Sequence, residues 1–152
     1  MRKELMALRE AMKRHRLDAY IIPTADFHGS EYVGDFFKCR EYVSGFTGSA
    51  GTLVVTESFA GLWTDGRYFL QAAEQLAGTG IDLLKMGQPN VPTVQAWLET
   101  HMTAGEVLAF DGRSMTALAG NALETAMTQK GVSIRYDLDL VGEIWKDRPG
   151  LS

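Results

Sequence analysis

The spacing of apolar residues alternates between helical and extended patterns along the chain, and this alternation limits the fold more than any other feature. Residues 2–16 repeat apolar residues at helical spacing, whereas residues 19–22 form a short apolar run followed by Pro23, which is typical of a buried strand that ends there. The same patterns predict further helices at 67–76, 93–101, 114–128 and 140–145, and further strands at 52–56, 60–64, 81–86, 107–110 and 132–135.

The order of these elements predicts an α/β fold. Glu57-Ser58 is a connection short enough for a hairpin between the runs 52–56 and 60–64, while the second half of the chain alternates strand and helix. Together they predict a mixed β-sheet with helices on both faces. A length of 152 residues suits one hydrophobic core, so we expect a single three-layer domain.

Composition narrows the class of protein. The chain is 45% hydrophobic and 22% charged, as in ordinary soluble proteins, and its formal net charge of -4 argues against binding to nucleic acid. Its one cysteine, Cys39, cannot form an internal disulfide, which favours a reducing, cytoplasmic location. The basic residues within positions 2–16 are interpreted as a solvated helix face rather than a membrane-binding one, and no segment is apolar enough to span a membrane.

Familiar catalytic and binding motifs do not account for the sequence. The three histidines lie far apart, which argues against a metal site in this chain. The glycines Gly45, Gly48 and Gly51 have neither the spacing nor the context of a dinucleotide-binding loop, so we interpret them as a turn that permits close backbone packing. Ser49 and Cys39 have no nucleophile motif around them and are interpreted as structural.

The segment Trp63–Tyr68 is harder to explain by structure alone. Arg67 falls in the first turn of a predicted helix, where a cation opposes the helix dipole at a cost of about 0.3–1 kcal/mol. Either a local salt bridge to a carboxylate such as Asp65 or an anion from outside the domain offsets this cost, and the residues alone favour the local bridge. Trp63 is interpreted as core rather than contact surface, although tryptophan is enriched at binding hot spots.

Several strings resemble the large Xaa-Pro aminopeptidases (aminopeptidase P), and the similarity runs through essentially the whole chain in order. The strings that carry it are Tyr20–Pro23, His28–Tyr32, Cys39–Thr52, Trp63–Ala73, Leu84–Gly87 and Ile144–Pro149. The resemblance is to the N-terminal domain of those enzymes, the creatinase/prolidase N-terminal type. It implies residues 1–148 as this domain and residues 149–152 as the start of a linker to further domains.

The resemblance also implies a function. Family members remove the N-terminal residue from peptides whose second residue is proline, using two divalent metal ions, usually manganese, in a C-terminal catalytic domain. This chain would then hold no cofactor and no catalytic residue, and would be inactive alone. Its expected partners are short Xaa-Pro peptides, its own catalytic domain and a second copy in a homodimer, with no nucleic acid or membrane.

The resemblance further implies which residues contact substrate. The arginine of Trp-Thr-Asp-Gly-Arg-Tyr contacts bound peptide in the family, and it falls on Arg67, which reverses the preference for a purely local salt bridge. Trp63 corresponds to an aromatic residue that walls the cleft, and Arg40 and His28 lie in matching strings. Two alternatives remain: a stand-alone module that binds peptides or proteins, and an independent enzyme with a site of unknown type.

Overall fold

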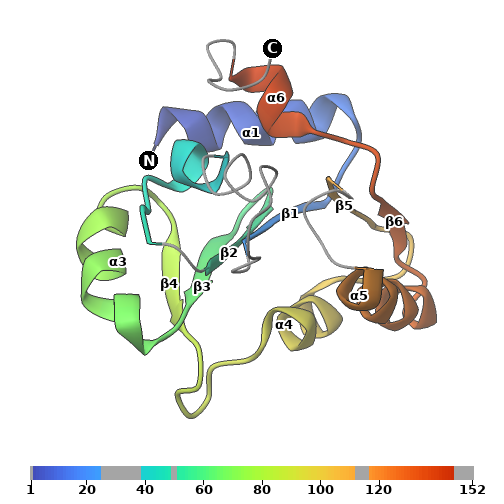
Figure 1. Cartoon of the computed structure of the whole chain (residues 1–152). Coiled ribbons are helices and arrows are strands. Elements are labelled where there is room, and N and C mark those ends of the chain that lie inside the picture. The colour runs from blue at the N-terminus through green and yellow to red at the C-terminus, as the bar shows by residue number, and fades with distance from the viewer. Residues whose placement is uncertain (1, 25–38, 49–50, 112–116, 146–152) are drawn as a thin grey trace.

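The computed structural model describes residues 2–24, 39–48, 51–111 and 117–145 (Figure 1). The described strands form one six-stranded sheet in the order β4-β3-β2-β1-β5-β6. Among them β2 runs antiparallel to both its neighbours, and the other pairs are parallel. The strands are β1 Ala19–Thr24, β2 Gly51–Thr56, β3 Ala60–Thr64, β4 Asp82–Lys85, β5 Val107–Phe110 and β6 Ser133–Arg135.

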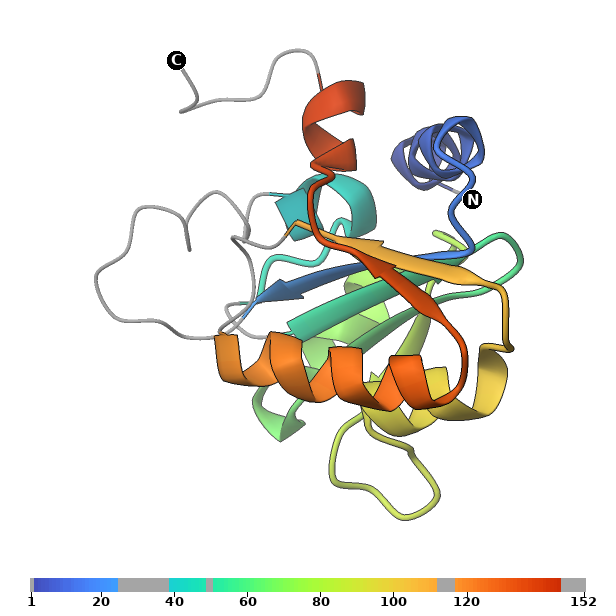
Figure 2. The same cartoon turned by 90° about the vertical axis from the view of Figure 1, so that its right-hand side faces the viewer.

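Helices cover both faces of this sheet, as Figure 2 shows. One face carries α1 Lys3–Arg14, a helical turn at residues 39–44, α3 Phe69–Leu76 and α6 Leu140–Ile144; the other carries α4 Val94–His101 and α5 Ala117–Gln129. Two separate clusters of buried side chains fill the spaces between sheet and helices. The predicted α/β, three-layer fold is therefore confirmed.

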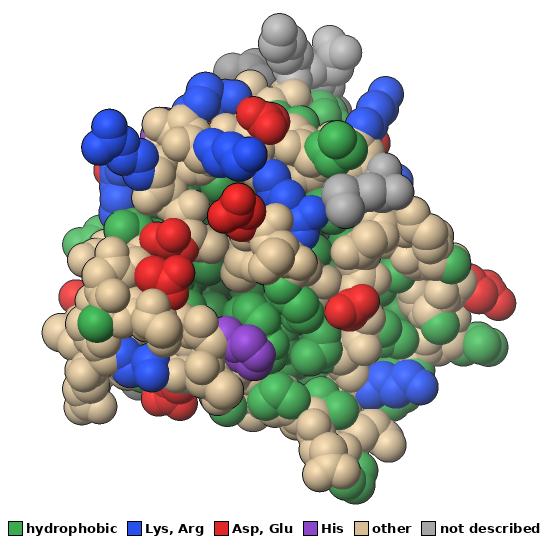
Figure 3. Space-filling view, turned by 180° about the vertical axis from the view of Figure 1, so that it is seen from behind, with side chains coloured by type: hydrophobic (Ala, Val, Ile, Leu, Met, Phe, Trp, Pro, Cys, Tyr) green, Lys and Arg blue, Asp and Glu red, His purple; other side chains and the backbone are tan. Residues whose placement is uncertain are grey.

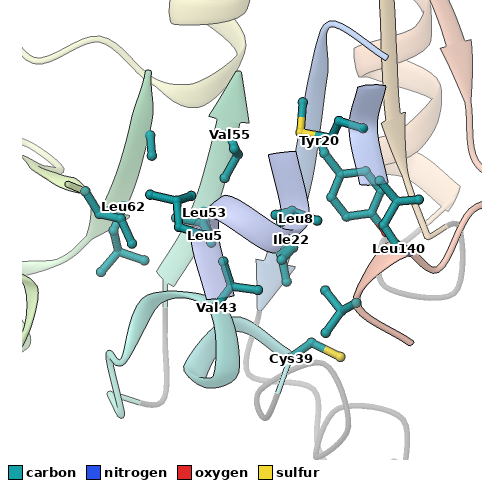
Figure 4. Packing of buried hydrophobic residues seen from close by; sticks show 14 of the residues in the cluster. Leu5, Leu8, Tyr20, Ile22, Cys39, Val43, Leu53, Val55, Leu62 and Leu140 are labelled. Atoms are coloured by element: carbon teal, nitrogen blue, oxygen red, sulfur yellow. The ribbon is translucent and has the colours of Figure 1, made fainter. Parts of the chain in front are cut away.

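Strand alternation divides the core between the two clusters. In β1, Tyr20 and Ile22 face α1, whereas Ala19 and Ile21 face α4 and α5, because successive side chains of a strand point to opposite faces. Figure 4 shows the α1 side, where Leu5 and Leu8 pack over β1 and β2. Each fully buried leucine contributes about 1.5–3 kcal/mol.

The C-terminal part of the described chain is fastened to this same layer. The Tyr20 hydroxyl donates a hydrogen bond to the Leu138 carbonyl at 2.6 Å and accepts one from the Leu140 amide at 3.3 Å. The rings of Tyr42 and Trp145 stack with 4.4 Å between centroids. The chain end therefore packs over β1 and the 39–44 turn.

One predicted boundary is wrong. Pro23 was expected to end the first strand, but β1 continues through it to Thr24, and Pro23 pairs with Thr52 of β2. The pairing of β1 with β5 extends only to Ile21. Beyond that point β1 has one strand partner among the described residues, so a proline without an amide proton is tolerated as on an edge strand.

The other predicted elements follow the sequence closely, whereas the helical turn at residues 39–44 was not predicted. The hairpin between β2 and β3 pairs Val55 with Ala60, as expected from the short connection. Helix α4 begins after Thr93, whose hydroxyl accepts from the Ala96 amide at 3.1 Å. The start of the helix predicted at 114–128 lies outside the described residues. Within the described part, no helix has the length and apolar character needed to cross a membrane.

Candidate functional site

Of the four residues predicted to bind substrate, Arg40 and Arg67 lie beside one edge of the sheet. We call it the carboxyl edge: β1, β3, β4, β5 and β6 end there, and β2 begins there. Thr24 pairs with Gly51, and Thr52 pairs with Trp63, so the end of β1, the start of β2 and the end of β3 are neighbours. Ligands of open α/β sheets commonly bind outside the carboxyl ends of the strands.

Asp65 and Arg67 form a salt bridge with each other just beyond the end of β3. A 3₁₀ turn, Gly66–Tyr68, begins after Asp65 and leads into α3. The Asp65 carboxylate accepts from the Arg67 backbone amide at 3.0 Å, from Nε at 3.0 Å and from Nη2 at 2.9 Å. The local salt bridge expected from the residues is thus present, and it offsets the unfavourable position of a cation at the start of a helical segment.

Charge and exposure distinguish this pair from the core. The hydrogen bonds from the Arg67 side chain are the main reason that the pKa of the Asp65 carboxyl is lowered. The Arg67 side chain remains 60% exposed. Arg67 is therefore a cation held at a defined place on the surface, with only its Nε and Nη2 edge engaged by Asp65.

Two aromatic rings connect Arg67 to the buried Arg40. The Arg67 guanidinium lies over the Tyr68 ring at 5.0 Å, and the Tyr68 ring meets the Phe46 ring edge to face at 5.9 Å. The Arg40 guanidinium lies over the other ring, 4.9 Å from the Phe46 centroid. We call Phe46 and Tyr68 the aromatic bridge. Such cation–π contacts contribute about 0.5–2 kcal/mol each, more when buried than when exposed.

Arg40 is completely buried and holds the glycine-rich segment in place. It donates through Nη1 to the Gly51 carbonyl at 3.2 Å and through Nη2 to the Gly48 carbonyl. Burial lowers the pKa of Arg40 to about 10, which still leaves it protonated at neutral pH. Arg40 is thus brought close to Arg67 in the fold, but as an internal support of the backbone.

The glycines pack closely here, as the sequence predicted. A Cβ on Gly48 would overlap the Phe46 ring, and one on Gly51 would crowd the Trp63 carbonyl at 3.2 Å and Arg40 Nη1 at 3.3 Å. The Thr47 side chain accepts hydrogen bonds from the Gln71 and Gln75 amides of α3, both at 2.9 Å. These contacts fix the segment before β2 against the helix that follows Arg67.

Trp63 is not grouped with the two arginines. Its ring is fully buried on the α4 side, where it meets the Phe59 and Trp97 rings, and Nε1 donates to the Pro92 carbonyl at 2.8 Å. The interpretation of Trp63 as core, made from the residues, is confirmed. Its expected role in walling a cleft stays a prediction, and His28 lies outside the described residues.

The edge opposite to the carboxyl edge has a surface hollow. Its volume is about 280 Å³, and it lies between the β2–β3 hairpin and the end of α4, lined by residues that include Phe59, Trp97 and His101. Figure 3 shows hydrophobic side chains gathered around a hollow with a histidine beside it. Neither Arg40, Trp63 nor Arg67 lines this hollow.

The described residues do not provide a metal centre. No group of three or more His, Cys, Asp or Glu side chains comes together in the part of the chain that the structure describes. His15 pairs with Glu143 at 2.8 Å, and His101 hydrogen-bonds through Nδ1 to the Trp97 carbonyl at 2.8 Å. The donor set needed for a dinuclear metal site is therefore not offered by these residues.

The sequence identified Arg67 and Arg40 as candidate residues but did not predict the aromatic bridge between them. Asp65 and Arg67 were identified as a possible salt bridge, whereas Phe46, Tyr68 and the Thr47 contacts with α3 were not predicted. One signal was available: Gly48 lies two residues after Phe46, and a glycine beside an aromatic residue can mark a ring lying on the backbone.

Comparison with known proteins places the chain in a family. Residues 5–139 match the model of the creatinase/prolidase N-terminal domain. Aminopeptidase P2 of Arabidopsis thaliana is 45% identical over 133 residues, which are 86% of this chain and 19% of the relative. A probable Xaa-Pro aminopeptidase P of Tuber melanosporum is 44% identical over 148 residues, 95% of this chain and 24% of the relative. The chain thus spans a quarter or less of these relatives.

Solved structures agree with the sequence matches. X-prolyl aminopeptidase from Caenorhabditis elegans, described as a cytosolic enzyme with a di-nuclear active site, superimposes with a TM-score of 0.87 at 37% identity, covering 99% of this chain and 26% of that one. The N-terminal domain of the cytoplasmic peptidase PepQ from Mycobacterium tuberculosis gives a TM-score of 0.66 at 25% identity, covering 95% and 99%. The chain therefore belongs to the creatinase/prolidase N-terminal domain family, in the form carried by aminopeptidase P-like proteins.

Proposed function

We propose that this chain is the non-catalytic N-terminal domain of a Xaa-Pro aminopeptidase and that its carboxyl edge helps to form the cleft for short peptides with proline in second position. The observation that carries the proposal is the exposed Arg67 guanidinium, held by Asp65 beside strands whose ends converge. Support comes from relatives that are named aminopeptidase P2 and probable Xaa-Pro aminopeptidase P and are about four to five times longer than the matched region.

Arg67 suits contact with a peptide. A peptide presents carbonyl oxygens and a terminal carboxylate, and guanidinium groups bind both through charge-assisted hydrogen bonds. Asp65 engages the Nε and Nη2 edge of the guanidinium. In this proposal the peptide contacts Arg67 in addition to the local salt bridge, which the sequence presented as the alternative to an external anion.

The other predicted residues take supporting roles in this proposal. Arg40 and Trp63 are 0% exposed, so each acts by shaping the edge rather than by touching the peptide in the conformation described. Arg40 binds the carbonyls of Gly48 and Gly51, and Trp63 anchors the end of β3. His28 remains a proposed contact by resemblance.

Catalysis is assigned to a region outside this chain. Two divalent metal ions, proposed to be manganese, would activate water for attack on the scissile carbonyl in a separate catalytic domain. The described residues of this chain bind and orient substrate but hold no metal in this scheme. We place the domain at residues 1–148, with residues 149–152 as the start of a linker.

We also propose a cytoplasmic homodimer for the complete protein. A buried thiol at Cys39 that forms no disulfide suits a reducing compartment, and the C. elegans relative is described as cytosolic. The dimer follows from the family resemblance. Sedimentation of the protein encoded by the extended gene tests it, because a monomer at micromolar concentration would contradict this part of the proposal.

Hydrolysis of a short Xaa-Pro peptide tests the main proposal. We expect no activity from the 152-residue chain with added manganese, and activity from the product of the same gene extended past Ser152. Activity in the short chain would mean that it is an independent enzyme. An inactive extended protein, together with direct peptide binding by the short chain, would favour a stand-alone binding module.

A further inference from the structure

We propose that Asp65 is a positioning residue, which orients the Arg67 guanidinium for contact with substrate. This inference rests on the proposed function, because it assumes that Arg67 meets the peptide. It goes further by assigning a role to a residue that would not itself touch substrate. The carboxylate holds both the backbone amide of Arg67, at 3.0 Å, and the guanidinium, at 3.0 Å through Nε and 2.9 Å through Nη2.

The geometry limits how the Arg67 side chain can move. A bidentate contact with a carboxylate sets the plane of the guanidinium, and the carboxylate is itself fixed by the backbone amide. The Tyr68 ring, 5.0 Å from the guanidinium carbon, provides a second surface for the same group. An arginine side chain otherwise has many rotamers, and restricting them before binding reduces the entropy lost when substrate binds.

The 3₁₀ turn makes this arrangement compact. The Tyr68 amide donates to the Asp65 carbonyl at 3.0 Å, so the residue that carries the carboxylate and the ring beneath the guanidinium are joined by one turn of backbone. Tyr68 packs against Phe46, which also contacts the buried Arg40. The position of Arg67 is therefore tied to the core through the aromatic bridge and to the turn through Asp65.

The substitution Asp65→Asn separates positioning from folding. Asparagine can still accept a hydrogen bond from the Arg67 amide, so the start of the turn is retained, but it has neither the charge nor the two carboxylate oxygens. Asp137→Asn is a matched control. Asp137 also pairs with an exposed arginine two residues away, because its Oδ2 lies 3.3 Å from Nη2 of Arg135. Arg135 belongs to β6, which is at the opposite end of the strand order from β4.

The kinetic test uses the extended, active protein and a double-mutant cycle. We expect Arg67→Ala to raise KM about 10- to 100-fold, as for loss of a charged hydrogen bond. We expect Asp65→Asn to raise KM about two- to tenfold with little change in kcat, as for loss of one pre-ordered side chain. In the Arg67→Ala background, Asp65→Asn should then have no further effect, and Asp137→Asn should leave KM unchanged in either background.

The outcomes distinguish the two levels of the proposal. An effect of Arg67→Ala without an effect of Asp65→Asn would overturn positioning and leave the proposed function intact. Equal effects of Asp65→Asn with and without Arg67 would show that Asp65 acts through the fold, which also overturns it. No effect of Arg67→Ala would overturn the peptide contact itself.

A second measurement does not depend on activity. In the 152-residue chain, NMR relaxation of the Arg67 Nε–H group reports how ordered the guanidinium is. We expect Asp65→Asn to lower this order clearly and Asp137→Asn to leave it unchanged. An unchanged Arg67 signal in Asp65→Asn would contradict the positioning role whatever the kinetics show.

Discussion

Arg40 and Arg67 belong to the same region of the fold, yet their surroundings differ in almost every respect. Arg40 is fully buried and donates to the carbonyls of Gly48 and Gly51, whereas the Arg67 side chain is 60% exposed and pairs with Asp65. Each lies over a ring of the aromatic bridge. The difference teaches that one residue type takes two roles within a short distance: a buried cation binds backbone carbonyls, and an exposed one forms an ion pair on the surface.

The physical basis of this division is the cost of burying charge. A buried guanidinium is tolerated only when its donors are satisfied, so Arg40 and the two glycine carbonyls depend on each other. An exposed ion pair such as Asp65–Arg67 adds little stability, with a typical contribution of about 0–1 kcal/mol. We therefore expect substitution of Arg40 to lower the stability of the fold, and substitution of Arg67 to weaken substrate binding.

The largest expected effect is that of Arg40→Met. It removes the donors to two buried carbonyls while keeping most of the side-chain volume, so we expect the free energy of unfolding to fall by about 2–4 kcal/mol. Urea denaturation of the 152-residue chain measures it. Arg67→Met is the matched control and should change stability by at most about 1 kcal/mol. Equal losses of stability in Arg40→Met and Arg67→Met would contradict the conclusion that only Arg40 supports the fold.

A smaller effect is expected of Gly48→Ala. Because the added methyl group would overlap the Phe46 ring, the ring or the backbone must shift, and we expect a loss of about 1–3 kcal/mol. Gly66→Ala is the control, since its Cβ would meet only Phe69, at 4.0 Å. Thermal unfolding compares the two variants, and a Gly48→Ala protein as stable as the Gly66→Ala protein would show that the ring does not need this close approach.

The smallest effect is a shift in titration, and it sharpens the description of the exposed pair. The Arg67 side chain lowers the pKa of the Asp65 carboxyl, so we expect Arg67→Ala to move this pKa back towards its ordinary value. A lowered pKa means that the pair stabilises the fold above the range where unfolded aspartate titrates, and that this stabilisation is lost as the pH falls. NMR titration of the Asp65 carboxyl carbon measures the shift.

A matched control for the titration is Asp137. The hydrogen bond from Arg135 is the main cause of the lowered pKa of Asp137. We therefore expect the Asp137 pKa to be unaffected by Arg67→Ala and to rise in Arg135→Ala. If the Asp65 pKa were the same with and without Arg67, the ion pair would not persist in solution. The description of Arg67 as part of a stable ion pair would then need revision, while the description of Arg40 would be unaffected.

Local sequence was sufficient for most of the elements and for the fold class. The period of apolar residues assigns helix or strand because a repeat of about 3.6 residues or of two residues decides which side chains share a face. β5, predicted at 107–110, has those bounds, and α4, predicted at 93–101, spans Val94–His101. The Asp65–Arg67 contact was also accessible from sequence, since the two residues are separated by a single glycine.

Features that depend on strand neighbours were decided only by tertiary structure. Pro23 is accommodated within β1 because the β5 partner ends at Ile21, and no local pattern contains that information. The burial of Arg40 is similar: its string gives no sign that the carbonyls of Gly48 and Gly51 lie around its guanidinium.

The sequence by itself thus determined most of the helices and strands, the α/β class and the family resemblance. Tertiary structure alone decided the strand order, the opposite faces taken by Trp63 and the aromatic bridge, and the separation of the two arginines into a support and a surface cation. The physical reason is the distance along the chain over which each feature is determined. Helical and extended periods arise from neighbouring residues, whereas the burial of a charge depends on groups brought together by pairing and packing of distant segments.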